Sequence, residues 1–249
     1  QLQKLVVAFQ EGALAPIPCQ SFPVDELADA FRLMAQGRHV GKLVILQPQR
    51  PEPVRILADA TYLVTGALGG VGLHLLPWLV DQGARSLLLV SRGVEGPSIE
   101  AQAVLDQLEA QGVSCRRFAC DLSGGASEAE RLRQVLMALP MEQPLRGLVH
   151  AAGVLRDRPM QELTSQDLNA VMAPKLNGWQ LLEQALEPFP PLDFQLAFSS
   201  LATLLGSPGQ VAYAAANGAL ETCCATAADH TPGSPMKLAI QWGPWAGAG

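Results

Sequence analysis

The sequence predicts an α/β protein whose main part is a doubly wound parallel sheet. Short apolar segments alternate with helical patterns along the chain, and strands covered by helices on both faces have this apolar composition. A glycine-rich segment also lies directly between the first of these strands and the next helix. Of the 249 residues, 49% are hydrophobic and 16% are charged, which is enough apolar content to fill a sizeable core.

Composition and charge exclude several classes of protein. The net charge is −6 with no basic run, so nothing indicates a nucleic-acid footprint, and a small local basic site is the alternative. No apolar stretch reaches the about eighteen residues that a transmembrane helix needs, and residues 1–7 lack the layout of a signal peptide. The five cysteines form no C-x-x-C pair, and the four histidines show no metal-ligand spacing. We therefore expect a cytoplasmic, reduced protein without a metal, membrane or nucleic-acid partner.

A proline-rich segment divides the chain. Residues 47–53 contain three prolines among polar residues, which is typical of a linker. We expect a small α+β fragment at residues 1–47, a linker at 48–54 and the main domain at 55–249. In the fragment we predict helices at residues 2–12 and from Asp25, an extended segment at 16–22 and a strand at 42–46.

The main domain carries the alternating pattern. Its predicted strands are residues 61–64, 86–90, 114–120, 147–150, 194–198 and 237–241. Its predicted helices are residues 72–82, 98–111, 128–138, 165–186 and 210–228. Strand–helix–strand connections favour parallel pairing, because the helix returns the chain to the same edge of the sheet.

The glycine-rich segment at residues 65–72 is the first candidate site. Glycine permits a tight turn and a close approach of the backbone to a pyrophosphate, while the following helix offers free N–H groups and a partial positive charge. An ordinary strand–helix turn is the alternative, which the position between strand and helix disfavours. The cofactor-binding residues predicted here are Thr65, Gly66, Leu68, Gly69, Gly70 and Gly72.

The end of the second strand bears on the choice of cofactor. A carboxylate there would accept hydrogen bonds from the ribose hydroxyls of NAD, but this chain has Ser91 and Arg92. An arginine pairs with a 2′-phosphate through its planar guanidinium group. We therefore expect NADPH, with Ser91 and Arg92 among its binding residues. A solvated loop arginine is the alternative for Arg92.

Two further strand ends complete the predicted cofactor site. Asp121 and Leu122 follow the third strand, where Asp121 taken alone is equally consistent with a helix cap or a turn. The fourth strand is followed by small residues, which let the backbone pass the ribose of a cofactor. The residues predicted at this strand end are His150, Ala151, Ala152 and Gly153.

Four side chains form the candidate catalytic group: Ser200, Tyr213, Asn217 and Lys175. Carbonyl reduction needs a proton donor, and a phenol, which ordinarily titrates near about pH 10, needs a nearby cation to serve at neutral pH. Lys175 supplies that cation and Ser200 an oxyanion-type hydrogen bond. Asn217 lies one turn beyond Tyr213 on the same helix face and holds the lysine or a water chain.

Three of these four residues have ordinary alternatives. Ser200 is suited to cap a helix, Asn217 to be an interior polar residue and Lys175 to be a surface lysine. Tyr213 is the strongest candidate, because the chain has only two tyrosines. The combination of all four downstream of the glycine segment favours the catalytic interpretation.

The spacing T-G-x-x-x-G-x-G at residues 65–72 resembles the fingerprint of short-chain dehydrogenases, which have a Rossmann-like fold. Most of these enzymes place the lysine four residues after the tyrosine, whereas here Asn217 takes that position and Lys175 lies in the earlier helix. This exchange resembles ketoreductase domains of modular polyketide synthases, and more loosely those of animal-type fatty acid synthases. The matching segments are residues 65–72, 150–153, 173–175, 198–200, 206–217 and 241–245.

The resemblance implies hydride delivery from NADPH to the 3-keto carbon of an acyl chain on an acyl carrier protein. It places Asp121 at the adenine edge of the cofactor and Pro244 in a loop that contacts the nicotinamide amide. In the family a lid helix follows this loop, so we expect the lid region to be truncated here and the acyl side of the pocket to be incomplete.

The resemblance also bears on stereochemistry. Residues 155–157, Leu-Arg-Asp, are similar to the Leu-Asp-Asp signature of B-type ketoreductases, which give the D-alcohol, although Arg156 replaces the middle aspartate. A-type enzymes usually carry a tryptophan eight residues before the tyrosine, where this chain has Leu205. We therefore expect a B-type enzyme. The predicted substrate-side residues are Leu155, Asp157, Leu205 and Gln210.

Residues 11–18 and 30–42 resemble the C-terminal end of enoylreductase domains, which are medium-chain reductases of the same synthases. No complete nucleotide motif accompanies them, so we expect a folded, inactive remnant, with an expression artefact as the alternative. The expected partners are the acyl carrier protein and the neighbouring enoylreductase and dehydratase domains.

Two other functions remain as alternatives. An inactive ketoreductase that only shapes the synthase would be expected to have lost Tyr213 or the glycine segment, and both are present. A short-chain enzyme acting on a free small molecule is disfavoured by Asn217 in place of lysine and by the enoylreductase-like segment.

Overall fold

The computed structural model describes residues 6–9, 11–15, 17–46, 54–94, 96–226 and 236–245. The chain divides into two compact units, Gln1–Pro53 and Val54–Gly249. Residues 48–53 of the linker predicted at 48–54 lie outside the described residues, as do parts of the first and last predicted helices.

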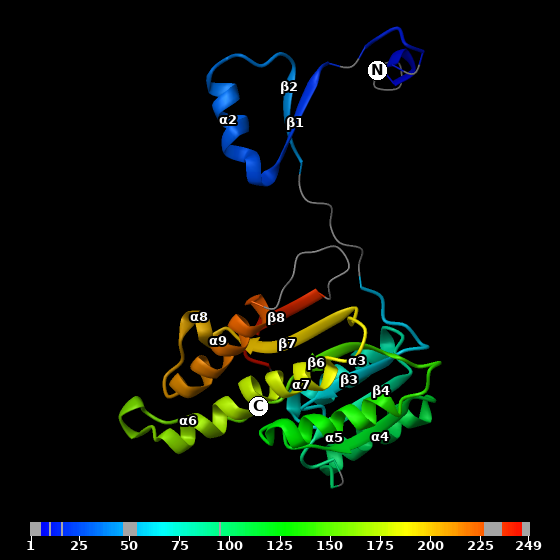
Figure 1. The fold of residues 1–249 in the computed structure, drawn as a ribbon, viewed down its shortest axis with the longest axis vertical. Coiled ribbons are helices and arrows are strands. Elements are labelled where there is room, and N and C mark those ends of the chain that lie inside the picture. Colours follow the sequence, from blue (N-terminus) through cyan, green and yellow to red (C-terminus); the bar gives the residue numbers. More distant parts are fainter. Residues whose placement is uncertain are drawn as a thin grey trace. The chain divides into compact units, whose positions relative to one another are not determined.

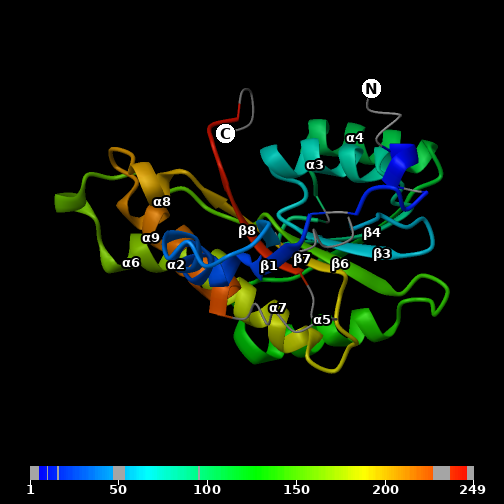
Figure 2. The same cartoon turned by 90° about the horizontal axis from the view of Figure 1, so that it is seen from above.

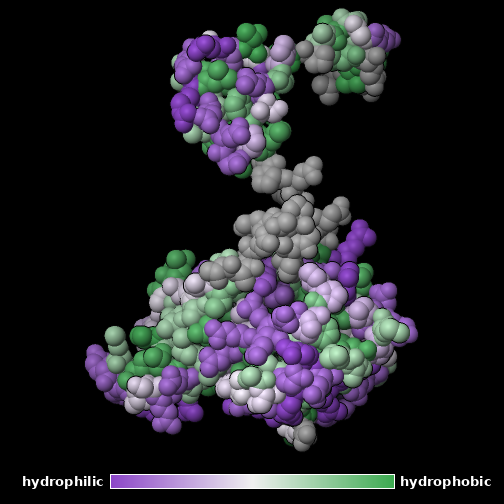
Figure 3. All heavy atoms as spheres, in the orientation of Figure 1, coloured by the Kyte–Doolittle hydropathy of each residue, from purple (hydrophilic) through white to green (hydrophobic). Residues whose placement is uncertain are grey.

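The first unit is a β–α–β arrangement. Strand β1 (Cys19–Pro23) pairs in parallel with β2 (Lys42–Leu46), and helix α2 (Leu27–Ala35) joins them after the 3-10 turn η1 (Val24–Glu26). Among its described residues only Ala30 is buried, whereas Phe31 and Met34 are 56% and 48% exposed. Figure 3 shows green, apolar residues interspersed with purple, hydrophilic ones on the visible face of this unit. The described part of the first unit therefore encloses no apolar core of its own.

The second unit is built on one six-stranded parallel sheet with the strand order β5-β4-β3-β6-β7-β8 (Figure 1). Its order reverses between β3 and β6, which is the topology of a doubly wound, Rossmann-like sheet. The predicted fold class is therefore confirmed. The strands are β3 (Thr61–Thr65), β4 (Ser86–Ser91), β5 (Ser114–Ala119), β6 (Leu145–His150), β7 (Phe194–Ser200) and β8 (Met236–Trp242).

Helices cover both faces of this sheet (Figure 2). Helices α3 (Gly70–Asp81) and α4 (Ile99–Ala110) pack on one face, and α5 (Gly125–Met137) and α7 (Gly178–Leu186) on the other. Val64 of β3 joins the apolar cluster of α3, whereas the adjacent Leu63 joins that of Trp179 in α7, because side chains alternate across a strand. In the described part of the chain, no helix combines the length and apolarity required to span a bilayer.

The long helix predicted at residues 165–186 is interrupted. Helix α6 (Ser165–Met172) leads into a π-helical turn, η3 (Ala173–Asn177), before α7 begins. Pro174 lies at the start of this turn. Proline has no N–H to donate, and its ring clashes with the carbonyl group four residues earlier, so the regular helical ladder cannot continue there. The predicted helix is therefore present, but a π turn interrupts its α-helical hydrogen bonding at Lys175.

Other boundaries differ by smaller amounts. Helix α5 begins three residues earlier than expected, since Gly124 and Gly125 are poor helix formers and obscure its start. Two short helices that the sequence pattern does not indicate, η2 (Met160–Glu162) and α8 (Ala202–Leu205), each span about one helical turn. The last helix is α9 (Val211–Thr226).

Two helical glycines provide a matched test of packing at the glycine turn. A Cβ atom on Gly72 in α3 would lie 2.4 Å from carbonyl oxygens of Gly66 and Ala67, whereas one on Gly218 in α9 would meet nothing within 4 Å. We expect Gly72→Ala to lower the free energy of unfolding by about 1–3 kcal/mol, as overpacking does. We expect Gly218→Ala to raise it by up to about 1 kcal/mol, because alanine is the better helix former. Urea unfolding measures the free energy of unfolding of both variants. Equal changes in the two variants would contradict the tight contact of Gly72 with Gly66 and Ala67.

Candidate active site

The carboxyl ends of β3 and β6 lie side by side. Thr65 and His150 are partners in the register, and the N–H of Ala151 donates to the carbonyl oxygen of Thr65 at 3.1 Å. The strand order reverses between these two strands, and ligands of doubly wound sheets bind at that edge. The glycine turn at residues 65–72 and the small-residue segment at 150–153 therefore meet where a dinucleotide is expected.

The glycine turn is packed closely against the second segment. Gly66 has a φ of 66°, and a Cβ atom there would lie 2.7 Å from backbone atoms of Ala152. Gly69 is the N-cap residue of α3 and supplies no side-chain capping bond, and both Gly69 and Gly70 are exposed. The first N–H groups of α3 thus keep their hydrogen-bonding capacity for a ligand. A close, uncapped and exposed turn fits the pyrophosphate of a dinucleotide.

Strand β4 is followed directly by an exposed arginine. Ser91 is the half-buried last residue of β4, and Arg92 follows it in an exposed position. Arg92 makes no ion pair with any residue that the structure describes. Its guanidinium group is therefore available to an anionic group of a ligand, as a 2′-phosphate requires.

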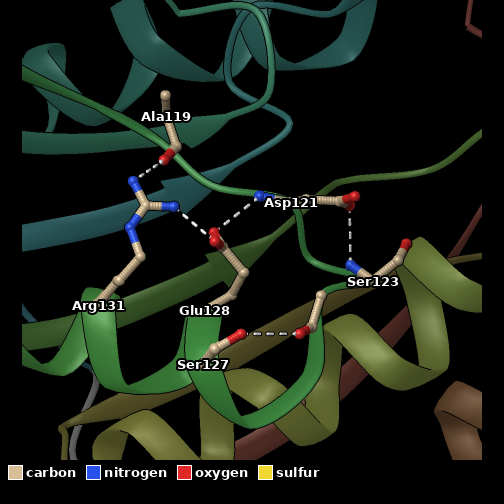
Figure 4. Close-up of polar contacts among 7 residues, drawn as sticks. Ala119, Asp121, Ser123, Ser127, Glu128 and Arg131 are labelled. Carbon is tan, nitrogen blue, oxygen red and sulfur yellow. Dashed lines mark hydrogen bonds and ion pairs between the residues drawn. The ribbon is translucent and has the colours of Figure 1, made fainter.

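Glu128 of α5 makes polar contacts at the carboxyl end of β5 (Figure 4). Its carboxylate accepts the N–H of Asp121 at 3.2 Å and pairs with Arg131, whose guanidinium group also reaches the carbonyl oxygen of Ala119. The hydrogen bond from Arg131 is the main reason that the pKa of Glu128 lies below its usual value. Asp121 accepts the N–H of Ser123 at 3.0 Å, so its exposed carboxylate also forms a turn. No pattern in the sequence indicates this role of Glu128.

Two other predicted cofactor-side residues are buried. Leu122 packs in the core cluster beneath α5 and α7, so its side chain is used in packing. The side chain of His150 is fully buried as well, which leaves only its backbone to border a cofactor.

Lys175 is the buried cation of the site. Its side chain is 3% exposed, and its Nζ donates to the carbonyl oxygen of Phe198 at 2.8 Å. The same Nζ lies 5.8 Å from the centre of the Tyr213 ring. Burial lowers the pKa of Lys175 to about 8. Lys175 is therefore not a surface lysine, and the structure brings it to Tyr213 from a segment 38 residues away.

The helix that carries the tyrosine packs against the helix that leads to the lysine. Ala212 and Ala216 of α9 form a small apolar cluster with Val171 of α6, and Tyr213 borders it. Asn217 is fully buried, and its Nδ2 donates to the carbonyl oxygen of Tyr213 at 2.9 Å. Its Oδ1 is buried without a hydrogen-bond partner among the described residues. Such an atom is costly unless it accepts a hydrogen bond from a ligand or a bound water.

Ser200 ends β7 beside a network of polar side chains. The adjacent Ser199 donates to the carboxylate of Glu221 on α9, and Thr203 Oγ1 lies 3.0 Å from that carboxylate and 2.9 Å from the carbonyl oxygen of Ser200. Gln241 of β8 donates to both Glu221 and Thr203. The network joins β7, β8 and α9 behind Ser200, and it holds the backbone of that residue in place.

The sequence carried a usable signal for part of this network. Glu221 follows Asn217 by four residues and Tyr213 by eight, so the three residues recur at the spacing of one helix face. The same spacing that identified Asn217 could have identified Glu221. Nothing local in the sequence connects Gln241 with it.

Three of the four predicted substrate-side residues lie at exposed positions, and Gln210 is half-buried. Asp157 accepts a hydrogen bond from Gln210 Nε2 at 2.9 Å, which joins two of the four predicted residues. The other two, Leu155 and Leu205, are exposed. Pro244 is exposed beyond β8, next to Trp245, whose ring lies 6.2 Å from that of His74 in α3. The loop that follows β8 therefore lies close to α3, the helix that begins at the glycine turn.

Comparison with protein families identifies the class of protein. The family model of the KR domain matches residues 60–247, and the model of zinc-binding dehydrogenases matches residues 1–45. The chain therefore belongs to the ketoreductase (KR) domain family of polyketide synthases. The match of the first unit supports the resemblance of that unit to the end of an enoylreductase.

Individual relatives agree with this assignment. The whole chain aligns at 37% identity with a phenolphthiocerol/phthiocerol polyketide synthase protein of Mycobacterium tuberculosis and covers 11% of that protein. It also aligns over its whole length, at 39% identity, with spectinabilin polyketide synthase system protein NorB of Streptomyces orinoci, again covering 11%. The solved structure of A-type ketoreductases from a modular polyketide synthase matches with a TM-score of 0.70 and 32% identity, over 81% of this chain and 40% of that one. The chain thus spans about a tenth of the length of these curated relatives.

Proposed function

We propose that this chain uses NADPH to reduce the 3-keto group of an acyl chain, held on an acyl carrier protein, to a 3-hydroxyacyl product. The observation that carries this proposal is the burial of the Lys175 ammonium group against Tyr213 at the ligand-binding edge of the sheet. The curated relatives are polyketide synthases of which the chain spans 11%, which supports neighbouring enoylreductase, dehydratase and carrier domains.

The residues at the strand ends are suited to hold the cofactor. The uncapped N–H groups of the first turn of α3, beginning at Gly70, would bind the pyrophosphate, and Arg92 the 2′-phosphate. Asp121 would border the adenine, and the small-residue segment at 150–153 the ribose. When bound, NADPH supplies the hydride that reduces the carbonyl carbon.

The side chains supply the proton and the charge stabilisation. A ketone that gains a hydride at carbon needs a proton at oxygen to become an alcohol, and Tyr213 donates that proton. The ammonium group of Lys175 stabilises the phenolate that remains. Ser200 donates a hydrogen bond to the same substrate oxygen as negative charge develops on it.

The burial of the lysine also suits the return of the proton. A pKa of about 8 keeps Lys175 charged at neutral pH and lets it release a proton more readily than an exposed lysine does. The buried Oδ1 of Asn217 can accept a hydrogen bond from the water that resupplies the phenolate. The unpaired amide oxygen thereby acquires a role in this reaction.

We further propose the B-type stereochemical outcome. Asp157 of the signature is retained and is held by Gln210, and Leu205 stands where A-type enzymes have tryptophan. The match to a solved A-type ketoreductase, at 32% identity, supports the shared fold and site and bears less on product configuration than these positions do.

The two tyrosines allow a matched test of the proton donor. With a 3-ketoacyl thioester substrate we expect Tyr213→Phe to slow NADPH oxidation at least about 100-fold, because the proton donor is lost. Tyr62→Phe removes the other tyrosine, whose hydroxyl only accepts the N–H of Leu57, and should retain turnover. NADPH binding, followed by fluorescence, should be equal in both. Unchanged turnover in Tyr213→Phe would reject the assignment.

In this proposal Arg92 determines the specificity for NADPH over NADH. We expect Arg92→Ala to raise the KM for NADPH about 10- to 100-fold, since a charge-assisted hydrogen bond contributes about 1.5–3 kcal/mol, and to leave the KM for NADH nearly unchanged. Arg55→Ala, at another exposed arginine, is the control and should change neither value. A parallel rise for both cofactors in Arg92→Ala would argue against binding of the 2′-phosphate.

The configuration of the alcohol tests the stereochemical proposal by itself. Chiral chromatography of the 3-hydroxyacyl thioester made by the unchanged chain should give the D-isomer. An L-product would overturn the B-type proposal and leave the reductase proposal intact.

A further inference from the structure

His150 is a fully buried imidazole that the proposed reaction does not use. It is the last residue of β6, and both of its ring nitrogens have partners. Its Nδ1 lies 2.7 Å from Thr65 Oγ1, and its Nε2 lies 3.2 Å from the carbonyl oxygen of Lys175. One ring therefore bridges the first residue of the glycine turn and the residue that carries the buried ammonium group.

The two partners determine which ring nitrogen carries the hydrogen. A carbonyl oxygen only accepts, so Nε2 must donate a hydrogen to the Lys175 carbonyl. Nδ1 is then an acceptor, which the hydroxyl of Thr65 satisfies as donor. Burial, and secondly the Lys175 charge, lowers the pKa of His150 to about 3, so the ring is neutral at neutral pH.

The carbonyl that His150 holds belongs to the irregular turn η3. This turn contains Pro174, which breaks the regular α-helical hydrogen bonds, and the Lys175 carbonyl oxygen accepts the N–H of Gly178 as well as the imidazole Nε2–H. The imidazole also packs tightly against the residue that directly follows the turn, since a Cβ atom on Gly178 would lie 3.2 Å from His150 Cε1. The ring thus restrains the turn by a hydrogen bond and by close contact.

We propose that His150 is a positioning residue for Lys175: its neutral ring ties the π turn to the end of β3 and so holds the ammonium group against Tyr213. This inference rests on the proposed function for the role of Lys175. It adds a mechanical link between the cofactor turn, through Thr65, and the group that stabilises the phenolate. His150 touches neither substrate nor cofactor in this arrangement.

The titration of Lys175 reports whether the turn is held. Desolvation is the cause of its lowered pKa, and no carboxylate pairs with it in the described part of the chain. The ionisable side chains that face it are those of His150 from β6 and Tyr213 from α9. If the turn relaxes and water reaches the ammonium group, the charged form becomes more stable and the titration midpoint rises toward 10.5.

The experiment uses the whole chain labelled with ¹³C at lysine Cε, without substrate or cofactor. Its lysines are Lys4, Lys42, Lys175 and Lys237, so the signals are few. In the unchanged chain we expect the Lys175 signal to titrate near pH 8. His150→Phe keeps a ring but no hydrogen bonds and should raise the midpoint by about one pH unit. His150→Gln retains an Nε2 donor and should restore a midpoint near that of the unchanged chain.

Tyr62→Phe is the matched control. It removes a different, partly buried hydrogen bond of β3, that from the Leu57 N–H at 2.7 Å, at the opposite end of the strand from Thr65. It should leave the Lys175 midpoint unchanged even if the chain becomes less stable. In turnover, His150→Phe should lower kcat about 10- to 100-fold with little change in KM, as misplacement of a catalytic group does.

The imidazole of the unchanged chain gives a test that needs no variant. The ¹⁵N signals of His150 should show the Nε2–H form without titration between pH 5 and pH 9. The Nδ1–H form, titration near pH 6.5, or an unmoved Lys175 midpoint in folded His150→Phe would overturn the proposal. A failure of the ketoreductase proposal is distinguishable, because it would appear as turnover insensitive to Tyr213→Phe while both NMR signatures remained.

Discussion

The second unit depends on keeping one ammonium group in its interior. Burial of a charge is costly unless hydrogen bonds hold it, and the low pKa of Lys175 records part of that cost. The carbonyl oxygen of Phe198 accepts one of its hydrogens, and the ring of Tyr213 lies close to it. Pro174 breaks the helix at this point, where the lysine turns inward instead of continuing a regular helical face. Without the cation a phenol is a poor proton donor at neutral pH.

The parallel sheet places the other groups around this cation. Because all six strands run in one direction, the glycine turn after β3, His150 at the end of β6 and Ser200 at the end of β7 share one edge. The strand order reverses between β3 and β6, which opens that edge to a dinucleotide. Side chains remote in sequence, such as Glu221 and Gln241, then hold the backbone beside Ser200 from behind. In the proposed function, cofactor binding and catalysis therefore use residues at the same strand ends.

Much of this arrangement was predictable because it depends on local patterns. The glycine turn is contiguous in sequence, and its position between strand and helix identifies it without any tertiary information. The spacing of Tyr213 and Asn217 is that of one helix face, and their buried contact agrees with it. The apolar strands of the main domain were also found, because strands covered on both faces leave near-continuous apolar runs.

Other features were not predictable, because they arise between segments far apart in the chain. The π turn follows from Pro174, but its inward direction is decided by packing against β7 and α9. The contact of Glu128 with Asp121 depends on how α5 sits over the end of β5. The two bonds of His150 join three segments, and in sequence that histidine looked only like part of a small-residue strand end.

The sequence by itself determined the doubly wound fold class, the glycine turn and the helical spacing of Tyr213 and Asn217, since each is encoded by composition or by short spacing. Tertiary structure alone decided that Lys175 is buried, what its ammonium group contacts, and that one imidazole connects it to the cofactor turn. Burial and hydrogen-bond geometry are properties of packed surfaces, and the segments that form these surfaces are separated by tens of residues along the chain.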